Sequence, residues 1–236
     1  MRSRYQFEPG GKARILRADH PAVVEGRTLM RSRVRSARHL DRILIPGEMN
    51  AKIGGMWERG PWPGTRIFTL SLEERATCPR ECRQWRSCYG NHQRFTIRVR
   101  NDRYLIPRLE AEIPILAARF ERFSVRLHQL GDFYSVLYTR FWLDQVQRWP
   151  GLHCFGFTAR PRGSEIGKLI EQAGWDRFRI RFSNDPGLRS TSVMEEPPEK
   201  HPDGAINCLA QTGEAKKCED CGVCLTTSKR VVFALH

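Results

Sequence analysis

The chain of 236 residues is 40% hydrophobic, enough for a buried core, and no run approaches the roughly eighteen apolar residues that a membrane-spanning helix requires. Its N-terminus carries no apolar stretch that could serve as a secretory signal, so we expect a cytoplasmic protein with no membrane partner. The formal net charge is +14, carried by 33 arginines and 7 lysines. This charge favours a polyanion partner, DNA or RNA above all, because a guanidinium binds two phosphate oxygens at once; a basic surface that serves only solvation is the alternative.

The first region that the composition separates is a basic N-terminal extension at residues 1–60. Residues 1–64 contain thirteen Lys and Arg against six Asp and Glu, a net charge of +7. The run "GPWPG", from Gly60 to Gly64, is typical of a boundary before a domain. The extension is either a free arm or a packed segment, and we expect it to contribute to nucleic-acid binding.

Beyond this boundary, alternating hydrophobicity predicts strands and helices in turn. Strands are expected within 65–72, 123–131, 152–161 and 177–185. Helices are expected at 107–121, 137–149 and 164–174. Pro114 should kink or divide the first helix, whereas Ser164 is a suitable N-cap and Gly174 a suitable stop for the last.

Strands and helices that alternate at this spacing are typical of right-handed βαβ units in an α/β fold. The parallel sheet that they build is either open or rolled into a partial (β/α) barrel, and we assign this core to residues 61–190. Residues 191–236 are expected to form a cysteine-rich C-terminal segment. It begins with a polar connector at 192–204, "SVMEEPPEKHPDG", and ends with a short strand, "RVVFALH".

Polar residues follow the expected strands at the edge where α/β proteins place their ligand sites. The candidate binding residues after the second, third and fourth strands are Gly131, Asp132, Thr158, Arg160, Ser183 and Asp185. If the strands are parallel, these residues converge with the loop after the first strand on one site.

Four of these candidates also have a simpler interpretation. Asp132 could cap the following helix, and Arg160 could bind phosphate or be solvated. Ser183 and Asp185 could form an Asx-type turn before Pro186. His128, on an apolar strand, is expected to be a hydrogen-bonded core histidine.

Seven of the eight cysteines fall into two groups, which in a reducing compartment indicates metal ligands rather than disulfides. The groups are Cys78, Cys82 and Cys88 in the first loop, and Cys208, Cys218, Cys221 and Cys224 near the C-terminus. Cys154 stands apart in an aromatic strand and is expected to be a small buried hydrophobe.

The three-plus-four count favours iron–sulfur chemistry. Four thiolates complete a [4Fe–4S] cube, while three leave one iron open to an exogenous ligand. Zinc is the alternative metal, because "CEDCGVC" could supply half of a zinc module. One cluster that draws ligands from both groups remains possible, so one or two clusters are expected.

Read together, "TCPRECRQWRSCY", "VRLHQLGDFYSVLYTRFW", "FTARP", "RFSND", "CEDCGVC" and the terminal "FALH" resemble the phage gene product 88 family. These are proteins similar to radical S-adenosylmethionine enzymes, and the resemblance covers about residues 65–236. It implies a partial (β/α) barrel whose first loop binds a [4Fe–4S] cluster. It also implies that Gly131 and Asp132 meet the methionine amine of S-adenosylmethionine.

The sequence departs from the usual radical motif in two places. The cysteines of the first loop are separated by three and five residues, whereas the usual spacing is three and two. The second motif is "GD" in place of the commoner "GGE", which keeps one carboxylate and loses a glycine.

Two classes of function are therefore expected. The first is an iron–sulfur enzyme of radical S-adenosylmethionine type that acts on nucleic acid or another anionic substrate. The second is a non-catalytic DNA- or RNA-binding regulatory protein that an iron–sulfur cluster or zinc stabilises. The sequence does not identify a substrate, a catalytic group or an oligomeric state.

Overall fold

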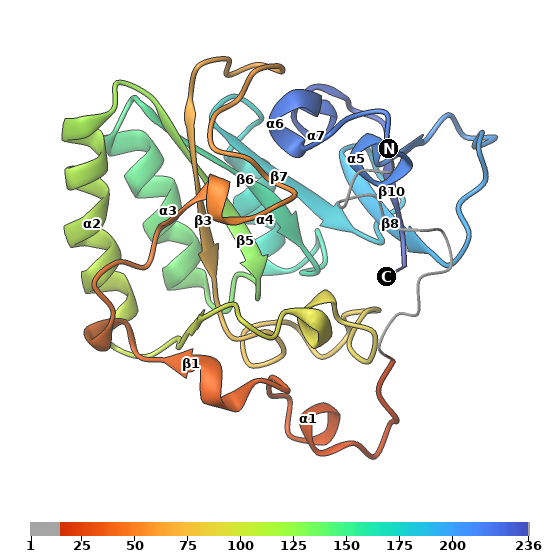
Figure 1. The fold of residues 1–236 in the computed structure, drawn as a ribbon, viewed down its shortest axis with the longest axis horizontal. Coiled ribbons are helices and arrows are strands. Elements are labelled where there is room, and N and C mark those ends of the chain that lie inside the picture. Colours follow the sequence, from red (N-terminus) through yellow and green to blue (C-terminus); the bar gives the residue numbers. More distant parts are fainter. Residues whose placement is uncertain (1–14, 236) are drawn as a thin grey trace.

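The computed structural model describes residues 15–235, and one mixed sheet lies at its centre (Figure 1). The strands of this sheet are β2 (Ile45–Pro46), β3 (Arg66–Ser71), β5 (Phe123–Leu130), β6 (Leu152–Thr158), β7 (Phe178–Ser183), β8 (Ser190–Met194), β9 (Ile206–Asn207) and β10 (Val231–Ala234). Their spatial order is β2-β3-β5-β6-β7-β8-β10-β9. Every neighbouring pair is parallel except β2 and β3, which are antiparallel. The predicted α/β class is confirmed.

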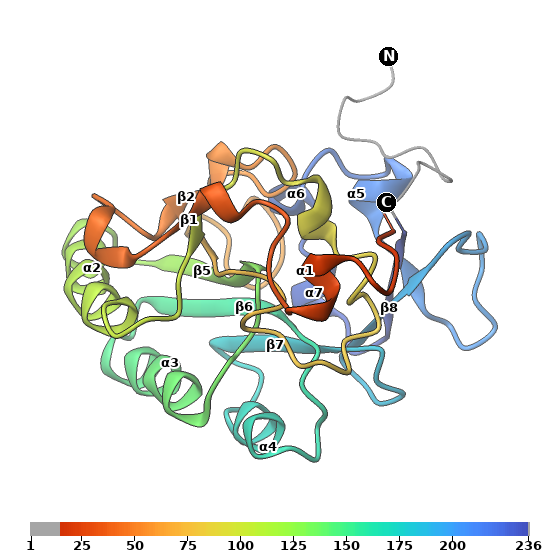
Figure 2. The same ribbon diagram turned by 90° about the horizontal axis from the view of Figure 1, so that it is seen from below.

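Three crossover helices cover one face of this sheet. They are α2 (Leu105–Arg119), α3 (Val136–Arg148) and α4 (Glu165–Gln172). Figure 2 shows α3 and α4 on one side of β5, β6 and β7. Their apolar faces pack on the strands in the main core, where Trp142 of α3 and Ile113 of α2 are fully buried. Each helix connects two parallel strands, as the alternating pattern predicts.

The other face is covered by residues from both ends of the chain. Ile53, Trp57 and Trp62 pack with Phe155 of β6 and with Leu225 near the C-terminus. The indole nitrogen of Trp57 donates to Ser124 Oγ of β5 at 3.0 Å. The described part of the N-terminal extension is thus a packed segment rather than a free arm. The first fourteen residues of the expected basic extension lie outside the described residues.

Short helices and strands lie near the two ends of the chain. Near the N-terminus lie α1 (Pro21–Val24) and β1 (Val34–Arg35), and β1 pairs in parallel with β4 (Arg98–Val99). The C-terminal segment contains α5 (Leu209–Thr212), α6 (Cys218–Cys221) and α7 (Val223–Thr226). None of the helices found in residues 15–235 has the length and apolarity needed to cross a bilayer.

Three local expectations can be compared directly with the fold. Pro114 does not divide its helix, because α2 continues through it and is held to the sheet by buried Leu109 and Ile113. Ser164 caps α4 as predicted, since its hydroxyl accepts from Gly167 N at 3.0 Å, and Gly174 follows the helix with φ of +77°.

The start of the predicted polar connector is wrong. Residues 190–194 form β8, which pairs in parallel with both β7 and β10. The sequence "STSVM" carries little apolar alternation, yet Ser190 and Thr191 are buried because two strands flank them. Pairing with distant strands, rather than local pattern, fixes this element.

Candidate functional site

The three cysteines of the first loop face one cavity at the carboxyl ends of the parallel strands. The cavity measures about 260 Å³. Its walls include Cys78, Cys82, Cys88, Gly131, Asp132 and Ser183. Residues from three separate strand ends therefore meet in the place that the parallel sheet predicts.

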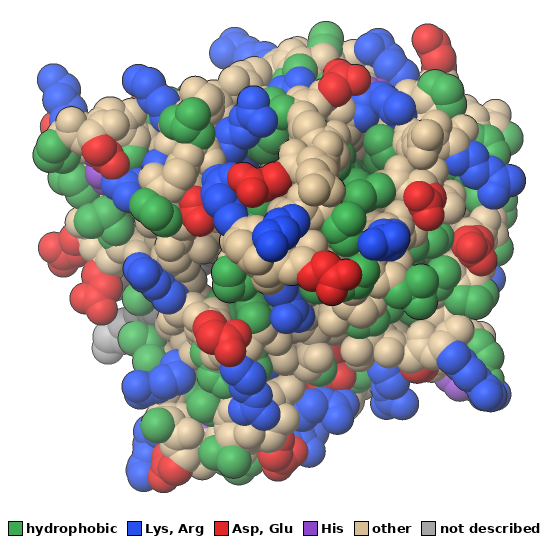
Figure 3. All heavy atoms as spheres, turned by 180° about the vertical axis from the view of Figure 1, so that it is seen from behind, with side chains coloured by type: hydrophobic (Ala, Val, Ile, Leu, Met, Phe, Trp, Pro, Cys, Tyr) green, Lys and Arg blue, Asp and Glu red, His purple; other side chains and the backbone are tan. Residues whose placement is uncertain are grey.

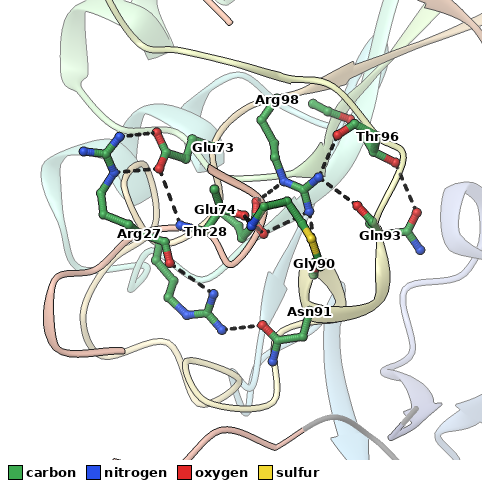
Figure 4. A network of polar contacts seen from close by, with 12 residues as sticks. Arg27, Thr28, Glu73, Glu74, Gly90, Asn91, Gln93, Thr96 and Arg98 are labelled. Carbon is green, nitrogen blue, oxygen red and sulfur yellow. Dashed lines mark hydrogen bonds and ion pairs between the residues drawn. The ribbon is translucent and has the colours of Figure 1, made fainter. Parts of the chain in front are cut away.

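A buried ion-pair network anchors the base of this loop (Figure 4). Glu74, three residues after the end of β3, accepts two hydrogen bonds from Arg98, at 2.8 and 3.1 Å, and a third from Thr28 Oγ1 at 2.6 Å. The Arg98 side chain is fully buried and that of Glu74 is 1% exposed. Arg98 also donates to the backbone carbonyls of Gln93 and Gly90, at 2.8 and 3.0 Å. Through Arg98, the network connects the start of the cysteine loop at Glu74 with its end at Gly90 and Gln93.

Neighbouring charged residues extend this network. Glu73 accepts from Arg27 at 2.6 Å, which ties the loop to the N-terminal segment. Arg75 adopts a positive φ of 63° and donates to Trp85 O at 2.8 Å and to Asn91 Oδ1 at 2.6 Å. A residue in this left-handed conformation carries a cost that the surrounding hydrogen bonds offset. Hydrogen bonds within the loop therefore stabilise its conformation.

Asp132 joins the end of β5 to the end of β6. Its Oδ1 accepts from Thr158 Oγ1 and from Phe133 N, and its Oδ2 accepts from Ala159 N, each at 2.7 Å. Burial raises the pKa of Asp132 to about 6, although these hydrogen bonds act in the opposite direction. Asp132 does not cap α3, because Ser135 accepts from Tyr138 N in that position.

Gly131 and Arg160 pack the strand ends against the cysteine loop. Gly131 has φ of +85°, and a Cβ there would lie 2.6 Å from both Leu72 Cβ and Thr77 Oγ1. Only glycine allows this approach without displacement. Arg160 donates to Phe133 O at 2.8 Å and to Thr77 O at 2.9 Å. Arg160 thus links two loops and is not simply solvated.

The remaining candidates divide between the cavity and its surroundings. Ser183 is part of the cavity wall. Asp185 is not among the wall residues; it pairs with Arg162 at 2.7 Å and accepts from Gly187 N at 2.8 Å. Asp185 therefore forms the Asx-type turn that was its simpler interpretation. Thr158 is fully buried and reaches the site through Asp132.

Burial controls the protonation of the first cysteine group. It raises the pKa of Cys88 to about 12 and that of Cys78 well above its usual value, and nearby carboxylates add to both shifts. Burial likewise raises the pKa of Cys82. These thiols stay protonated at neutral pH unless a cation compensates the thiolate charge, which is what a coordinating metal supplies.

The four C-terminal cysteines lie close enough together to affect one another's pKa values. Burial raises the pKa of Cys224 to about 12 and that of Cys221 to about 11. Cys208 and Cys218 act on both thiols and raise these pKa values further. None of these four cysteines is among the described residues of the cavity wall, although Cys218 raises the pKa of Tyr89, which belongs to that wall.

Backbone contacts bring this second group to the N-terminal segment. Cys218 N donates to Lys52 O at 2.8 Å, and Glu219 N donates to Ile53 O at 3.0 Å. The Glu219 carboxylate accepts from Gly55 N at 2.6 Å. Because residues 52–55 also cover the sheet, the C-terminal cysteines depend on the N-terminal segment for their position.

Two arginines that the sequence analysis missed lie beside the C-terminal thiols. Arg181 of β7 is 1% exposed and donates to backbone carbonyls of the C-terminal segment, including Cys224 O at 2.7 Å and Lys229 O at 2.9 Å. Arg126 of β5 is half-buried and lies over the ring of Phe157, 5.3 Å from its centroid; its charge opposes the rise in the pKa of Cys218 that burial causes. Within the described residues, neither arginine forms an ion pair with a carboxylate.

A buried cation without a carboxylate is costly unless another anion is close. The thiolates of a metal-loaded four-cysteine site would be that anion, so the donor set and its surroundings fit a thiolate-bound group. The only sequence signal for Arg126 and Arg181 is their inward position in the strands "FSVRLHQL" and "RFRIRFS".

The cysteines do not surround a single point. Across residues 15–235, no three or more His, Cys, Asp or Glu side chains are close enough together to hold one metal ion.

Comparisons with protein-family models, with curated proteins and with solved structures gave no match. The functional interpretation therefore depends on the residues and geometry of this chain.

Proposed function

We propose that this chain is an iron–sulfur protein of radical S-adenosylmethionine type, similar to the phage gene product 88 family, that acts on nucleic acid. The parallel strands from β3 to β10 would correspond to the partial (β/α) barrel of such proteins. The observation that carries the proposal is the meeting of Cys78, Cys82 and Cys88 with Gly131 and Asp132 in one cavity. Three thiols, with no fourth among the described residues of that wall, correspond to a cluster with one open iron.

The C-terminal cysteines would hold a second [4Fe–4S] cluster. Cys208, Cys218, Cys221 and Cys224 supply four thiolates, the full ligand set of a cube. Arg126 and Arg181 support this assignment, because their positive charges, half-buried at Arg126 and buried at Arg181, would offset the negative charge of four thiolates. The described cavity wall contains Cys78, Cys82 and Cys88 and none of the four C-terminal cysteines, which favours two clusters over one shared cluster.

A [4Fe–4S] cluster with an open iron supplies one-electron reduction of bound S-adenosylmethionine. This chain contributes position and exclusion of water. Asp132, fixed by Thr158, presents a carboxylate in the cavity wall that can accept further hydrogen bonds from an ammonium group. Arg160 and Gly131 hold the cysteine loop against that carboxylate.

A second candidate is a non-catalytic nucleic-acid-binding protein that an iron–sulfur cluster or zinc stabilises. One observation favours it: both oxygens of Asp132 already accept hydrogen bonds from within the chain. In that function Asp132 only joins two strand ends, and no small-molecule cofactor contacts it.

Titration of anaerobic, iron-replete protein with S-adenosylmethionine distinguishes these candidates. We expect heat of binding and a change in the electron paramagnetic resonance signal of the reduced cluster, followed by slow release of 5′-deoxyadenosine and methionine. Asp132→Asn should weaken this binding at least tenfold, because the amide removes the charge that attracts the ammonium group while keeping the size of the side chain.

Asp185→Asn is the matched control, since Asp185 lies outside the cavity wall and should leave binding unchanged. Iron content is measured in both variants, so that loss of cofactor binding is separated from loss of the cluster. Neither heat nor spectral change in the unsubstituted protein would favour the non-catalytic candidate.

A further inference from the structure

A groove adjoins the cysteine cavity and opens to the surface beside the β2 edge of the sheet. Its volume is about 770 Å³, and it shares four wall residues with the cavity: Asn50, Lys52, Tyr89 and Gln129. The rest of its wall comes mainly from residues 40–51 and 93–99. A ligand in the groove can therefore reach the cavity through a shared wall.

The charged side chains in the groove wall all have the same sign. Arg42 and Lys52 belong to the wall, and no described Asp or Glu does. Three more arginines, at positions 33, 35 and 38, precede the wall segment in the basic run "RSRVRSAR". Among the described residues, none of the three forms an ion pair with a carboxylate. This edge of the molecule is suited to an anion.

An exposed aromatic ring lies in the same wall. Phe95 is 83% exposed, the most of any large hydrophobic side chain described, and Met49 of the groove is 77% exposed. The guanidinium of Arg33 lies 5.8 Å from the centre of the Phe95 ring, brought there by the pairing of β1 with β4. An open ring beside the Arg33 guanidinium, which forms no ion pair with a described carboxylate, provides a stacking surface next to a phosphate-binding charge.

We propose that this groove binds single-stranded nucleic acid, with a base stacked on Phe95 and the backbone phosphates on the arginines of residues 33–42. This assignment depends on the function proposed above and specifies the substrate class of that enzyme. A single strand is required because in a duplex the bases are stacked on one another, so that the Phe95 ring could not reach a base face. A base next to the one on Phe95 is then directed along Tyr89 towards the cysteine cavity.

An extended peptide fits this edge less well. A peptide that adds to a sheet needs a row of free backbone donors and acceptors. Strand β2 has only two residues, Ile45 and Pro46, and proline has no N–H to donate. On the face opposite to that of Figure 1, basic and acidic side chains are interspersed (Figure 3).

Fluorescence anisotropy with labelled oligo(dT) and oligo(U) of about 16 nucleotides tests the proposal on iron-replete protein. We expect Phe95→Ala to weaken binding about fivefold or more, the loss typical of one stacked base. The control is Leu137→Ala, which removes another exposed apolar side chain, on α3. It should leave the affinity unchanged.

The arginines are tested by a salt series with Arg33→Gln and Arg38→Gln combined. Loss of two phosphate contacts should reduce the slope of log affinity against log salt by about 1.4. Arg119→Gln combined with Arg148→Gln makes the same change in net charge on α2 and α3, where each guanidinium also lies over an aromatic ring. This control should leave the slope unchanged.

Three results would overturn the proposal: equal affinity for a duplex of the same length, equal losses in the test and control variants, or displacement of the oligonucleotide by an acidic peptide at similar concentration. Iron, sulfide and S-adenosylmethionine binding are measured on the same samples. If these remain as proposed while no oligonucleotide binds, the groove assignment fails and the cluster chemistry stands.

Discussion

His128 is a buried histidine that the fold keeps neutral. Its Nε2 lies 2.8 Å from the hydroxyl of Tyr138, and its ring meets that of Phe133 edge to face. Burial lowers the pKa of His128 from 6.5 to about 3. The expectation of a hydrogen-bonded core histidine is confirmed.

The lowered pKa predicts a pH dependence of stability. Below pH 6.5 the unfolded chain binds a proton at His128 and the folded chain does not, so stability falls as pH decreases towards 3. When the pH is lowered from 7.5 to 5.5, this group should lower the free energy of unfolding by about 1.4 kcal/mol. His128→Gln should remove that part of the pH dependence, as measured by urea unfolding at both pH values.

Exposed His39 provides the control for this measurement, because His39→Gln should leave the pH dependence as it is. An unchanged slope in His128→Gln would contradict a neutral buried histidine.

Single residues in the candidate site were only partly predictable from sequence. That Asp132 lies at a strand end follows from the hydrophobic pattern before it. That its carboxylate binds Thr158 and Ala159 does not follow, because these partners are 26 and 27 residues away. The sequence places Gly131 among the binding residues, but the close approach of Leu72 and Thr77 to it does not follow from the sequence, because both are more than 50 residues away.

At the scale of elements, the cysteine loop depends on the Glu74–Arg98 pair beneath it. Both side chains are buried, and their shortest contact is 2.8 Å. Removing one partner of a buried ion pair leaves an uncompensated charge, which typically costs about 3–5 kcal/mol. We expect Glu74→Gln to lower the free energy of unfolding by this amount and to reduce the iron retained.

Glu48→Gln is the matched control, because Glu48 pairs with Arg66 at 3.2 Å on the surface. Exposed pairs contribute about 0–1 kcal/mol. Denaturant unfolding and iron analysis of the two variants compare them directly. Similar losses in both variants would show that the buried network does not hold the loop.

The elements themselves differ in how much the sequence predicts. Strands β3, β5, β6 and β7 have strong apolar content and were expected, as were α3 and α4. Strand β8 was missed because its polar residues are buried only by strands distant in sequence. The ion pair of Glu74 with Arg98 was missed for the same reason, since nothing local in "SLEERATC" indicates its partner.

At the scale of the whole molecule, both ends of the chain complete the site. The N-terminal segment covers one face of the sheet through Trp57 and positions the C-terminal cysteines through Lys52 and Ile53. Parallel strand order predicts the convergence of Cys78, Asp132 and Ser183. The contact of residues 52–55 with Cys218 and Glu219 was not predictable, because it spans more than 160 residues without a local pattern.

The central claim is that seven cysteines hold two [4Fe–4S] clusters. The most direct measurement is iron, labile sulfide and zinc analysis of protein prepared without oxygen in iron-rich medium, together with Cys82→Ser and Cys221→Ser. We expect about eight iron and eight sulfide per chain, and about four of each in either variant. Stoichiometric zinc without labile sulfide, or loss of all iron in Cys82→Ser, would contradict the account.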